Sequence, residues 1–329
     1  MQPHPTFASF FNYTSFNMKA FILTEPTGPR GLRLTELPTP TPAATDVLLR
    51  VQALSVNPVD AKSTEGKAMY GRFKDEQPLI LGWDVAGTVE AVGAAVTSLR
   101  PGDEVFGMIN FPGHARAYAE YVAAPAAHLV RKPATTSTTD AAAATLAALT
   151  AWQALVSQAN LQAGQRVLIH AAAGGVGHYA VQLAKHLGAY VIGTASAAKR
   201  DFALSLGADE VIDYQAQAFE QALEPVDVVL DCLSGETQLR SLEVLKPGGT
   251  LVSILGLTPD TPARAEQRGV TAKAMLVDSN QPGMQEVADL LASGALRSHV
   301  SLTVPFAELP KALEQILTGS TQGKVVITL

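Results

Sequence analysis

Cysteine is almost absent from this chain of 329 residues, which contains only Cys232. An internal disulfide is therefore impossible, and the cysteine content gives no sign of an oxidising compartment. Structural zinc sites built on two to four thiolates are excluded for the same reason. The single thiol follows an apolar strand pattern, and we interpret it as a buried and unreactive side chain.

Charged residues are also sparse, at 16% of the chain, whereas hydrophobic residues make up 47%. This balance is typical of a well-packed globular protein and excludes a largely disordered one. The formal net charge of −6 provides no general attraction for nucleic acid. Long apolar runs are missing too, because the alanine-rich stretch Ala141–Trp152 is too short to cross a bilayer and contains two threonines. We therefore expect neither a nucleic-acid partner nor a membrane span.

The first 17 residues lack both lysine and arginine. A secretory signal needs a basic start and a transit peptide is rich in arginine, so this segment fits neither class. Met18 then opens an apolar run that is typical of a strand. We expect residues 1–17 to be an unstructured extension or the product of a misassigned start codon, with a docking arm as the alternative. We expect the protein to be cytoplasmic.

The pattern of secondary structure changes at about residue 134. Before it, from residue 18 to 133, short apolar runs alternate with turn residues and predict a barrel-like β domain. After it, Thr139-Asp140 can cap a helix from Ala141 to about Gln158, and strands then alternate with helices. This alternation predicts an α/β fold with a parallel sheet covered on both faces. Beyond about Thr261 we expect a strand, two helices and a last strand, Lys324–Leu329.

A glycine-rich turn joins the first strand of the α/β region to its helix. The apolar run Val167–Ala171 leads into Ala173-Gly174-Gly175-Val176-Gly177. Glycine lets backbone amides approach an anion closely, and a helix N-terminus adds favourable partial charge. The strict G-x-G-x-x-G pattern is not met, because alanine replaces its first glycine. The strand–turn–helix context nevertheless predicts a dinucleotide phosphate site, with a purely structural turn as the alternative.

The residues after the next strand indicate which dinucleotide binds. In NAD-binding domains a carboxylate about 20 residues beyond the glycines holds the ribose 2′-hydroxyl. This chain has no carboxylate there and instead carries Thr194, Ser196, Lys199 and Arg200. Small polar and cationic side chains suit a 2′-phosphate, so we predict NADPH as the cofactor. The alternative is an ordinary solvated start of a helix.

Short motifs follow one another in a specific order between Met18 and Leu329. They are Val56-Asn57-Pro58-Val59-Asp60, Leu81-Gly82-Trp83-Asp84-Val85-Ala86-Gly87, Pro101-Gly102-Asp103-Glu104-Val105-Phe106-Gly107, Leu149-Thr150-Ala151-Trp152, Leu206-Gly207-Ala208-Asp209, Leu245-Lys246-Pro247-Gly248-Gly249 and Gly323-Lys324-Val325-Val326. Together with the glycine-rich turn they resemble the medium-chain dehydrogenase/reductase superfamily. The most similar branch is that of the zinc-free quinone oxidoreductases, which includes zeta-crystallin-like proteins and alkenal/enone reductases.

The resemblance implies an architecture and an oligomeric state. A Rossmann domain at 134–261 is inserted into a GroES-like, β-rich catalytic domain formed by 18–133 and 262–329. The active site then lies in the cleft between the two domains. A homodimer or homotetramer is also implied, whereas residues 1–17 have no counterpart in the family.

The resemblance also implies where the catalytic residues lie. It places Asn57, Asp60 and Thr150 beside the nicotinamide, and it leaves Tyr70 able to donate its hydroxyl to the substrate. Simpler roles exist for three of them: Asn57 in a turn, Asp60 as a helix cap and Tyr70 as packing. We add Leu255, at a strand end, and Lys324, in the last motif, to the expected cofactor site.

Zinc-dependent alcohol dehydrogenases of the superfamily have a cysteine near the Asn57 position and Gly-His-Glu in place of Gly82-Trp83-Asp84. Both ligand positions are changed here, and the remaining histidines are not spaced as a metal site. We therefore expect no catalytic zinc. Trp83 is expected to fill the vacated volume, with stacking on the substrate as the alternative.

The missing zinc narrows the chemistry. Without a metal to polarise the carbonyl, interconversion of aldehydes and alcohols is disfavoured. A quinone or a conjugated enone is already electrophilic, so hydrogen-bond donors and positioning suffice. We predict an NADPH-dependent quinone or enone oxidoreductase acting on a small molecule. The alternatives are an enoyl-thioester reductase, a non-catalytic crystallin-like NADPH-binding protein and an RNA-binding protein, the last disfavoured by the net charge.

Overall fold

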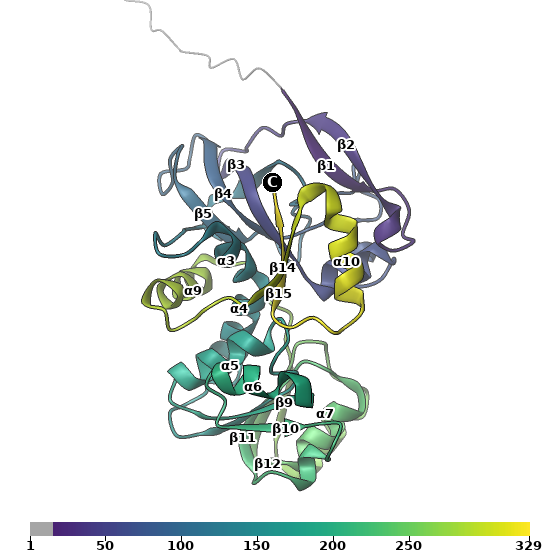
Figure 1. The fold of residues 1–329 in the computed structure, drawn as a ribbon, viewed down its shortest axis with the longest axis vertical. Helices are drawn as coiled ribbons and strands as arrows, with labels where there is room; N and C mark the ends of the chain where they lie inside the picture. Colours follow the sequence, from purple (N-terminus) through teal and green to yellow (C-terminus); the bar gives the residue numbers. More distant parts are fainter. Residues whose placement is uncertain (1–15) are drawn as a thin grey trace, which may run out of the picture.

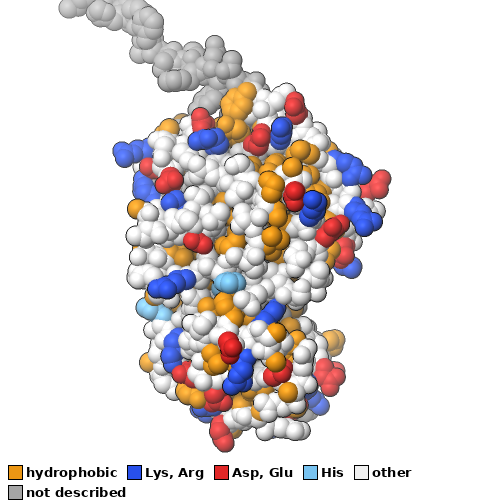
Figure 2. Space-filling view, in the orientation of Figure 1, with side chains coloured by type: hydrophobic (Ala, Val, Ile, Leu, Met, Phe, Trp, Pro, Cys, Tyr) orange, Lys and Arg blue, Asp and Glu red, His pale blue; other side chains and the backbone are white. Residues whose placement is uncertain are grey.

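The computed structural model of the protein describes residues 16–329. The expected extension at 1–17 therefore lies almost entirely outside the described residues. Figure 1 shows two lobes, the upper one containing both ends of the described chain and the lower one its middle part. Figure 2 shows acidic and basic side chains interspersed over both lobes on the same face. Within residues 16–329 no helix is long and apolar enough to span a bilayer.

The upper lobe is built on a β-sheet with strand order β14-β15-β3-β4-β5-β7, to which β6 is added by pairing with β3. A separate antiparallel pair is formed by β1 and β2. The strands of this lobe are β1 Asn17–Leu23, β2 Leu32–Pro38, β3 Asp46–Val56, β4 Asp84–Val92, β5 Glu104–Met108, β6 Tyr121–Pro125, β7 Val130–Arg131, β14 Val300–Pro305 and β15 Lys324–Thr328. Its helices are α1 Pro58–Thr64, α2 Tyr70–Phe73, α9 Gln281–Ser293 and α10 Leu309–Leu317.

The C-terminal strand β15 completes the N-terminal sheet. It pairs antiparallel with β3, so that Val325 lies opposite Val56. The prediction that the last strand joins the N-terminal domain is confirmed. As a result, Lys324 lies beside the Val56-Asn57 motif, although 268 positions in the chain separate Lys324 from Val56.

The lower lobe contains a six-stranded parallel sheet in the order β10-β9-β8-β11-β12-β13. Its strands are β8 Arg166–Ile169, β9 Tyr190–Ala195, β10 Glu210–Asp213, β11 Val226–Asp231, β12 Leu245–Ser253 and β13 Thr271–Ala274. Helix α3 Thr138–Ala143 precedes this lobe and lies against the upper one. The helices that follow it are α4 Leu146–Trp152, α5 Gly177–His186, α6 Arg200–Ser205, α7 Gly235–Glu243 and α8 Thr261–Arg268. The predicted doubly covered Rossmann sheet is therefore present.

Alternate residues of each strand bury opposite faces of this sheet. Val167 and Ile169 of β8 belong to the large core that also contains apolar residues of α5 and α6. Leu168, between them, belongs to a second core with residues of α7 and α8. Because strand side chains alternate between faces, the continuous apolar run of β8 serves both cores.

The parallel sheet extends further along the chain than expected. Strand β13 pairs with β12 and follows helix α8, which the sequence pattern did not predict. Residues 271–274 therefore lie in the Rossmann sheet and not in the second catalytic segment expected from residue 262. The hydrophobic pattern of this short strand is weak, since its residues are only partly buried at the sheet edge.

The helix expected from Ala141 to about Gln158 is divided. Helix α3 is capped by Ser137, whose hydroxyl accepts from the Asp140 amide, and α4 starts only at Leu146. The Leu146 amide donates to the Asp84 carboxylate at 3.0 Å, so a tertiary contact replaces the helical one. Helix α3 packs on the upper lobe and α4 packs on α5 of the lower lobe. The break thus lies where the chain passes between the lobes.

Candidate active site

The glycine-rich loop runs between β8 and α5 as predicted. A Cβ on Gly177 would lie 2.1 Å from the Ala171 carbonyl oxygen, so only glycine fits there. Gly175 is different, because a Cβ there would meet its nearest atoms at 3.7 Å. The amides of Gly175, Val176 and Gly177 donate to no acceptor within the described residues. Free amides at a helix N-terminus form a cradle that fits the pyrophosphate of a dinucleotide.

Ala171 directly precedes Ala172, which takes the place of the first glycine in the dinucleotide pattern. The φ of Ala171 is 51°, in the left-handed region that non-glycine residues rarely adopt. The turn therefore contains, at Ala171, a backbone conformation that glycine favours. Thr194 supports the turn, because its hydroxyl accepts from the Ala171 amide at 3.2 Å.

His178 holds the loop from inside the protein. Its Nδ1 donates to the Gly174 carbonyl at 2.9 Å, and its Nε2 accepts from the His299 amide at 3.4 Å. Burial lowers the pKa of this imidazole to about 4, with Lys324 adding to the effect. His178 is therefore neutral at physiological pH and connects the loop to the C-terminal segment.

The residues predicted to bind the 2′-phosphate lie at the carboxyl end of β9, and they differ in exposure. Thr194 is buried, and Ser196 is half-buried at the start of a short turn. Lys199 donates to the carbonyl oxygens of Ser320 and Thr321. The Arg200 guanidinium donates to the carbonyl of Val211 in β10. The turn thus groups Ser196 with Lys199, whereas Arg200 is directed to the neighbouring strand.

A fully buried polar cluster lies where β3, β4, β15 and α1 meet. The Asp84 Oδ2 accepts from the Ser55 hydroxyl at 2.6 Å and from the Asn57 Nδ2 at 2.7 Å. The Lys324 ammonium donates to Asn57 Oδ1 and lies 3.8 Å from the Asp84 carboxylate. Burial lowers the pKa of Lys324, whereas the Asp84 and Asp60 carboxyls oppose this shift. The predicted residues Asn57 and Lys324 are therefore in direct contact.

Asp60 lies in the next turn of the same region. Its Oδ2 accepts from the backbone N–H of Asn57 at 2.8 Å. Asp60 therefore caps helix α1, which is the simpler of the two roles considered for it. Its Oδ1 and the Tyr118 hydroxyl are buried without hydrogen-bond partners among the described residues. Burial raises the pKa of the Asp60 carboxyl to about 7, and the nearby Asp84 carboxylate adds to the rise. A neutral carboxyl is less costly to bury than an ionised one.

Three other predicted residues, Thr150, Tyr70 and Leu255, form no hydrogen bond to this cluster. The Thr150 hydroxyl donates to the Leu146 carbonyl within its own helix at 2.7 Å. Tyr70 is half-buried at the start of α2, and Leu255 is half exposed after β12. Ser55 and Asp84 belong to the cluster without having been predicted, although Asp84 stands in the Leu81–Gly87 motif. Tyr118, buried beside Asp60, was also not predicted.

Trp83 occupies the position of a histidine ligand in zinc-dependent relatives. Its indole N–H donates to the Gly113 carbonyl at 2.7 Å, and its ring packs edge-on against Phe111. An indole offers no lone pair for a metal. Among the residues that the structure describes, no group of three or more His, Cys, Asp or Glu side chains could hold a metal ion.

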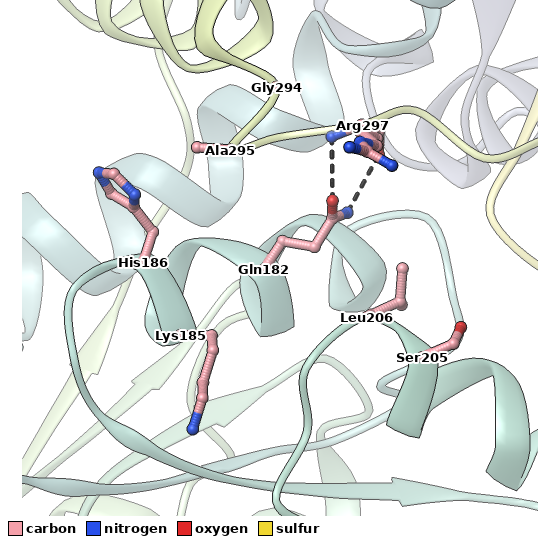
Figure 3. Close-up of a pocket in the computed structure, with 8 residues that line it drawn as sticks. All are labelled: Gln182, Lys185, His186, Ser205, Leu206, Gly294, Ala295 and Arg297. Carbon is pink, nitrogen blue, oxygen red and sulfur yellow. Dashed lines mark hydrogen bonds between the residues drawn. The ribbon is translucent and has the colours of Figure 1, made fainter.

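A surface pocket of about 400 Å³ lies away from these groups. Figure 3 shows that its lining comes from α5, the end of α6 and the segment around residues 294–297. The Gln182 side chain is bonded to both the amide and the carbonyl of Arg297. None of the predicted site residues lines this pocket, so it is separate from the candidate active site.

Comparison with known proteins agrees with this geometry. The alcohol dehydrogenase GroES-like domain family matches residues 43–134, and the zinc-binding dehydrogenase family matches residues 206–327. A mouse mitochondrial NAD(P)H oxidoreductase is 31% identical over 325 residues, which cover 86% of this chain and 82% of the relative. An Arabidopsis thaliana chloroplastic NADPH-dependent alkenal/one oxidoreductase is 32% identical, with 94% of this chain and 79% of the relative covered.

Among solved structures, the quinone oxidoreductase from Coxiella burnetii superposes with a TM-score of 0.91 at 36% identity. The match covers 95% of this chain and 100% of that protein. Both lobes are therefore shared, together with the order in which the chain forms them. The chain belongs to the medium-chain dehydrogenase/reductase superfamily, in which its relatives are quinone and alkenal/one oxidoreductases.

Proposed function

We propose that this protein is a zinc-independent oxidoreductase that uses NADPH to reduce a quinone or an α,β-unsaturated carbonyl compound. The observation that carries the proposal is that the glycine-rich loop, residues 173–177, adjoins the buried polar cluster. We refer to this segment as the phosphate loop. A Cβ on Gly175 would lie 3.7 Å from the Lys324 side chain, which in turn donates to Asn57. A site for phosphates and a group of hydrogen-bond donors thus adjoin each other.

Each part of the site has a role in this reaction. When bound, NADPH supplies the hydride. The loop amides and the α5 N-terminus bind the pyrophosphate, while Ser196 and Lys199 bind the 2′-phosphate. One N–H of the Asn57 amide is bonded to Asp84, and the other can donate to the cofactor or the substrate oxygen. Such preorganised donors stabilise negative charge as it develops on oxygen.

The absence of zinc from the proposal follows from the residues present. Trp83 cannot coordinate a metal, and Asn57 is engaged with Asp84 and Lys324. A conjugated acceptor spreads the charge that hydride transfer creates, so it places less demand on a Lewis acid. Quinones and enones therefore suit this site better than simple aldehydes.

We also propose the assembly and location that the family resemblance implies, a homodimer or homotetramer in the cytoplasm. The domain division follows the two lobes, with 18–133 and the C-terminal strands in the catalytic domain. Light scattering during size-exclusion chromatography measures the assembly directly. A monomer at micromolar concentration contradicts this part of the proposal.

The test of function is NADPH oxidation by purified protein with a quinone, an enone, an enoyl thioester and a saturated aldehyde. We expect turnover with the quinone or enone to exceed turnover with the aldehyde, and to be unchanged by a chelator. Activity that is lost on chelation and restored by zinc contradicts the proposal. A preference for the thioester supports the enoyl reductase alternative, and tight NADPH binding without turnover supports the non-catalytic one.

A further inference from the structure

We propose that Asp84 is a positioning residue of this active site, whose buried carboxylate holds Lys324 against the phosphate loop and fixes the orientation of the Asn57 amide. The inference rests on the proposed function, because the loop is taken as the cofactor site. Asp84 lies in one of the family motifs, but it was not among the residues predicted to take part in the reaction.

The contacts of Asp84 join four segments of the chain. Its carboxylate accepts from Ser55 in β3, from Asn57 at the start of α1 and from the Leu146 amide at the start of α4. The fourth contact is the ion pair with Lys324, the first residue of β15. Asp84 is 1% exposed and Lys324 is 2% exposed, so water cannot replace either partner. One side chain therefore fixes β3, α1, α4 and β15 relative to one another at the site.

The orientation of Asn57 depends on the acceptor character of Asp84. The Asn57 amide donates through Nδ2 to Asp84 and accepts through Oδ1 from Lys324. An asparagine at position 84 replaces one acceptor oxygen with an NH₂ group. Ser55, Asn57 and the Leu146 amide then compete for one oxygen, and at least one buried donor loses its acceptor.

The position of Lys324 depends on the charge of Asp84. The titratable groups around this pair are Asp60, Tyr118, Tyr179 and His178. His178 is neutral, and Asp60 is the other carboxyl of the cluster. When Asp60 holds a proton, Asp84 and Lys324 form a neutral pair, which meets the requirement that buried charges be compensated. Removal of the Asp84 charge leaves Lys324 to pair with Asp60 or to lose its proton.

Lys324 reaches the phosphate loop because the residue before it is tied to that loop. The Gly323 amide donates to the Ala173 carbonyl at 2.9 Å, and the Lys324 amide donates to His299 at 2.8 Å. The backbone is therefore fixed on the lower-lobe side, while Asp84 fixes the ammonium end. A change at Asp84 should move the ammonium without displacing the loop that binds the phosphates.

The experiment compares Asp84→Asn and Asp84→Glu with the wild type, and Asp227→Asn serves as the matched control. Asp227 is also a carboxylate paired with a lysine, Lys246, but it lies at the opposite end of the parallel sheet. The expected result for Asp84→Asn is a fall of at least about 10-fold in kcat/KM for the electron acceptor. The NADPH dissociation constant, measured by fluorescence titration, should change less than about 3-fold. These sizes correspond to the loss of an interaction made in the transition state.

A second readout uses the protein without cofactor or substrate. The carboxyl carbon signal of Asp60, followed by NMR across pH, should titrate at lower pH in Asp84→Asn, because a neighbouring negative charge has been removed. This shift reports the loss of the Asp84 charge beside Asp60, whereas the positioning role is tested by the split between kcat/KM and NADPH affinity. Asp84→Glu keeps the charge and should recover part of kcat/KM while leaving the Asp60 titration nearly unchanged.

The outcomes separate the two proposals. If the wild type turns over no acceptor, the proposed function and this inference both fail. If the wild type is active and folded Asp84→Asn keeps its kcat/KM, only the inference fails. If Asp84→Asn does not fold, Asp84→Glu is the deciding variant. Its carboxylate is displaced by one methylene, so kcat/KM should fall while NADPH affinity is retained. Wild-type kinetics in Asp84→Glu would overturn the inference.

Discussion

Lys199 donates a hydrogen bond of 2.7 Å to the carbonyl oxygen of Ser320, although 121 positions in the chain separate the two residues. The loop that contains Ser320 continues to Gly323, whose amide is bonded to Ala173 of the phosphate loop. The C-terminal segment is thus attached to the Rossmann lobe at both ends of the expected cofactor site. Burial lowers the pKa of the Lys199 ammonium. An ammonium has three donors, so one N–H remains for a phosphate beside Ser196.

The two cations after β9 should contribute unequally to NADPH affinity. Lys199→Ala should weaken NADPH binding about 10-fold to 150-fold, since a charge-assisted hydrogen bond to phosphate is worth roughly 1.5–3 kcal/mol. Arg200→Ala should have a smaller effect, because its guanidinium already donates to Val211. Dissociation constants for NADPH and NADH at fixed salt test this. Equal losses for the two cofactors in Lys199→Ala would place the 2′-phosphate elsewhere.

Two glycines of the phosphate loop should respond differently to substitution. Gly175→Asp should leave the melting temperature almost unchanged, because a Cβ fits at 3.7 Å, but should abolish NADPH binding by placing a negative charge at the pyrophosphate. Gly177→Ala should lower stability by about 1–3 kcal/mol, because its Cβ meets a backbone oxygen. Thermal unfolding and NADPH titration of both variants check the contrast. A folded Gly175→Asp protein with normal affinity contradicts the assignment of the loop.

Ala171→Gly should stabilise the protein. The left-handed conformation costs a non-glycine residue roughly 1–2 kcal/mol, and glycine loses part of this gain through the flexibility of the unfolded chain. A net gain of about 0.5–1 kcal/mol should raise the melting temperature by roughly 1–4 °C. Ala172→Gly is the control, because Ala172 is buried and has no positive φ. A melting temperature below that of the wild type would refute the strain at Ala171.

His178 should make the fold sensitive to acid. Burial lowers its pKa in the folded state to about 4 from 6.5, so the unfolded chain binds a proton that the folded protein rejects. The stabilisation is present above pH 6.5 and is lost as pH falls toward 4, by up to about 1.4 kcal/mol per pH unit. His178→Asn should therefore show a shallower decline of melting temperature over this range. His170, whose pKa is also lowered by burial to about 4, should retain its share of the decline.

The fold could be predicted from local patterns. The apolar run of β8 and the glycine-rich turn after it are properties of neighbouring residues, and they located this strand and the start of α5 within a few positions. Hydrophobic periodicity carries this information because burial of one face or of both is decided locally. The weak edge strand β13 was misplaced, since edge strands bury little and so show little pattern.

The glycine-rich loop, which we propose as the phosphate site, could also be located from the sequence, because its residues form one continuous segment. Gly177 must be glycine because a Cβ there would collide with the carbonyl oxygen of Ala171, which is only six positions earlier in the chain. The roles of Lys199 and Arg200 were not readable in the same way. Both are cations at adjacent positions, and only the folded chain shows that one is directed to Ser320 and the other to Val211.

The sequence by itself determined the two-lobed α/β architecture and the glycine-rich turn between a strand and a helix. It also predicted the dinucleotide site at that turn and the loss of zinc ligands at Asn57 and Trp83. Only the tertiary structure decided that Asp84 is the centre of the polar cluster. Its partners come from β3, α1, α4 and β15, and no spacing along the chain brings them together. The same contact divides the predicted helix at Leu146, because a buried carboxylate binds an amide more strongly than a helical carbonyl does. Long-range electrostatic pairing of this kind depends on which strands become neighbours, and that is settled only when the sheet has formed.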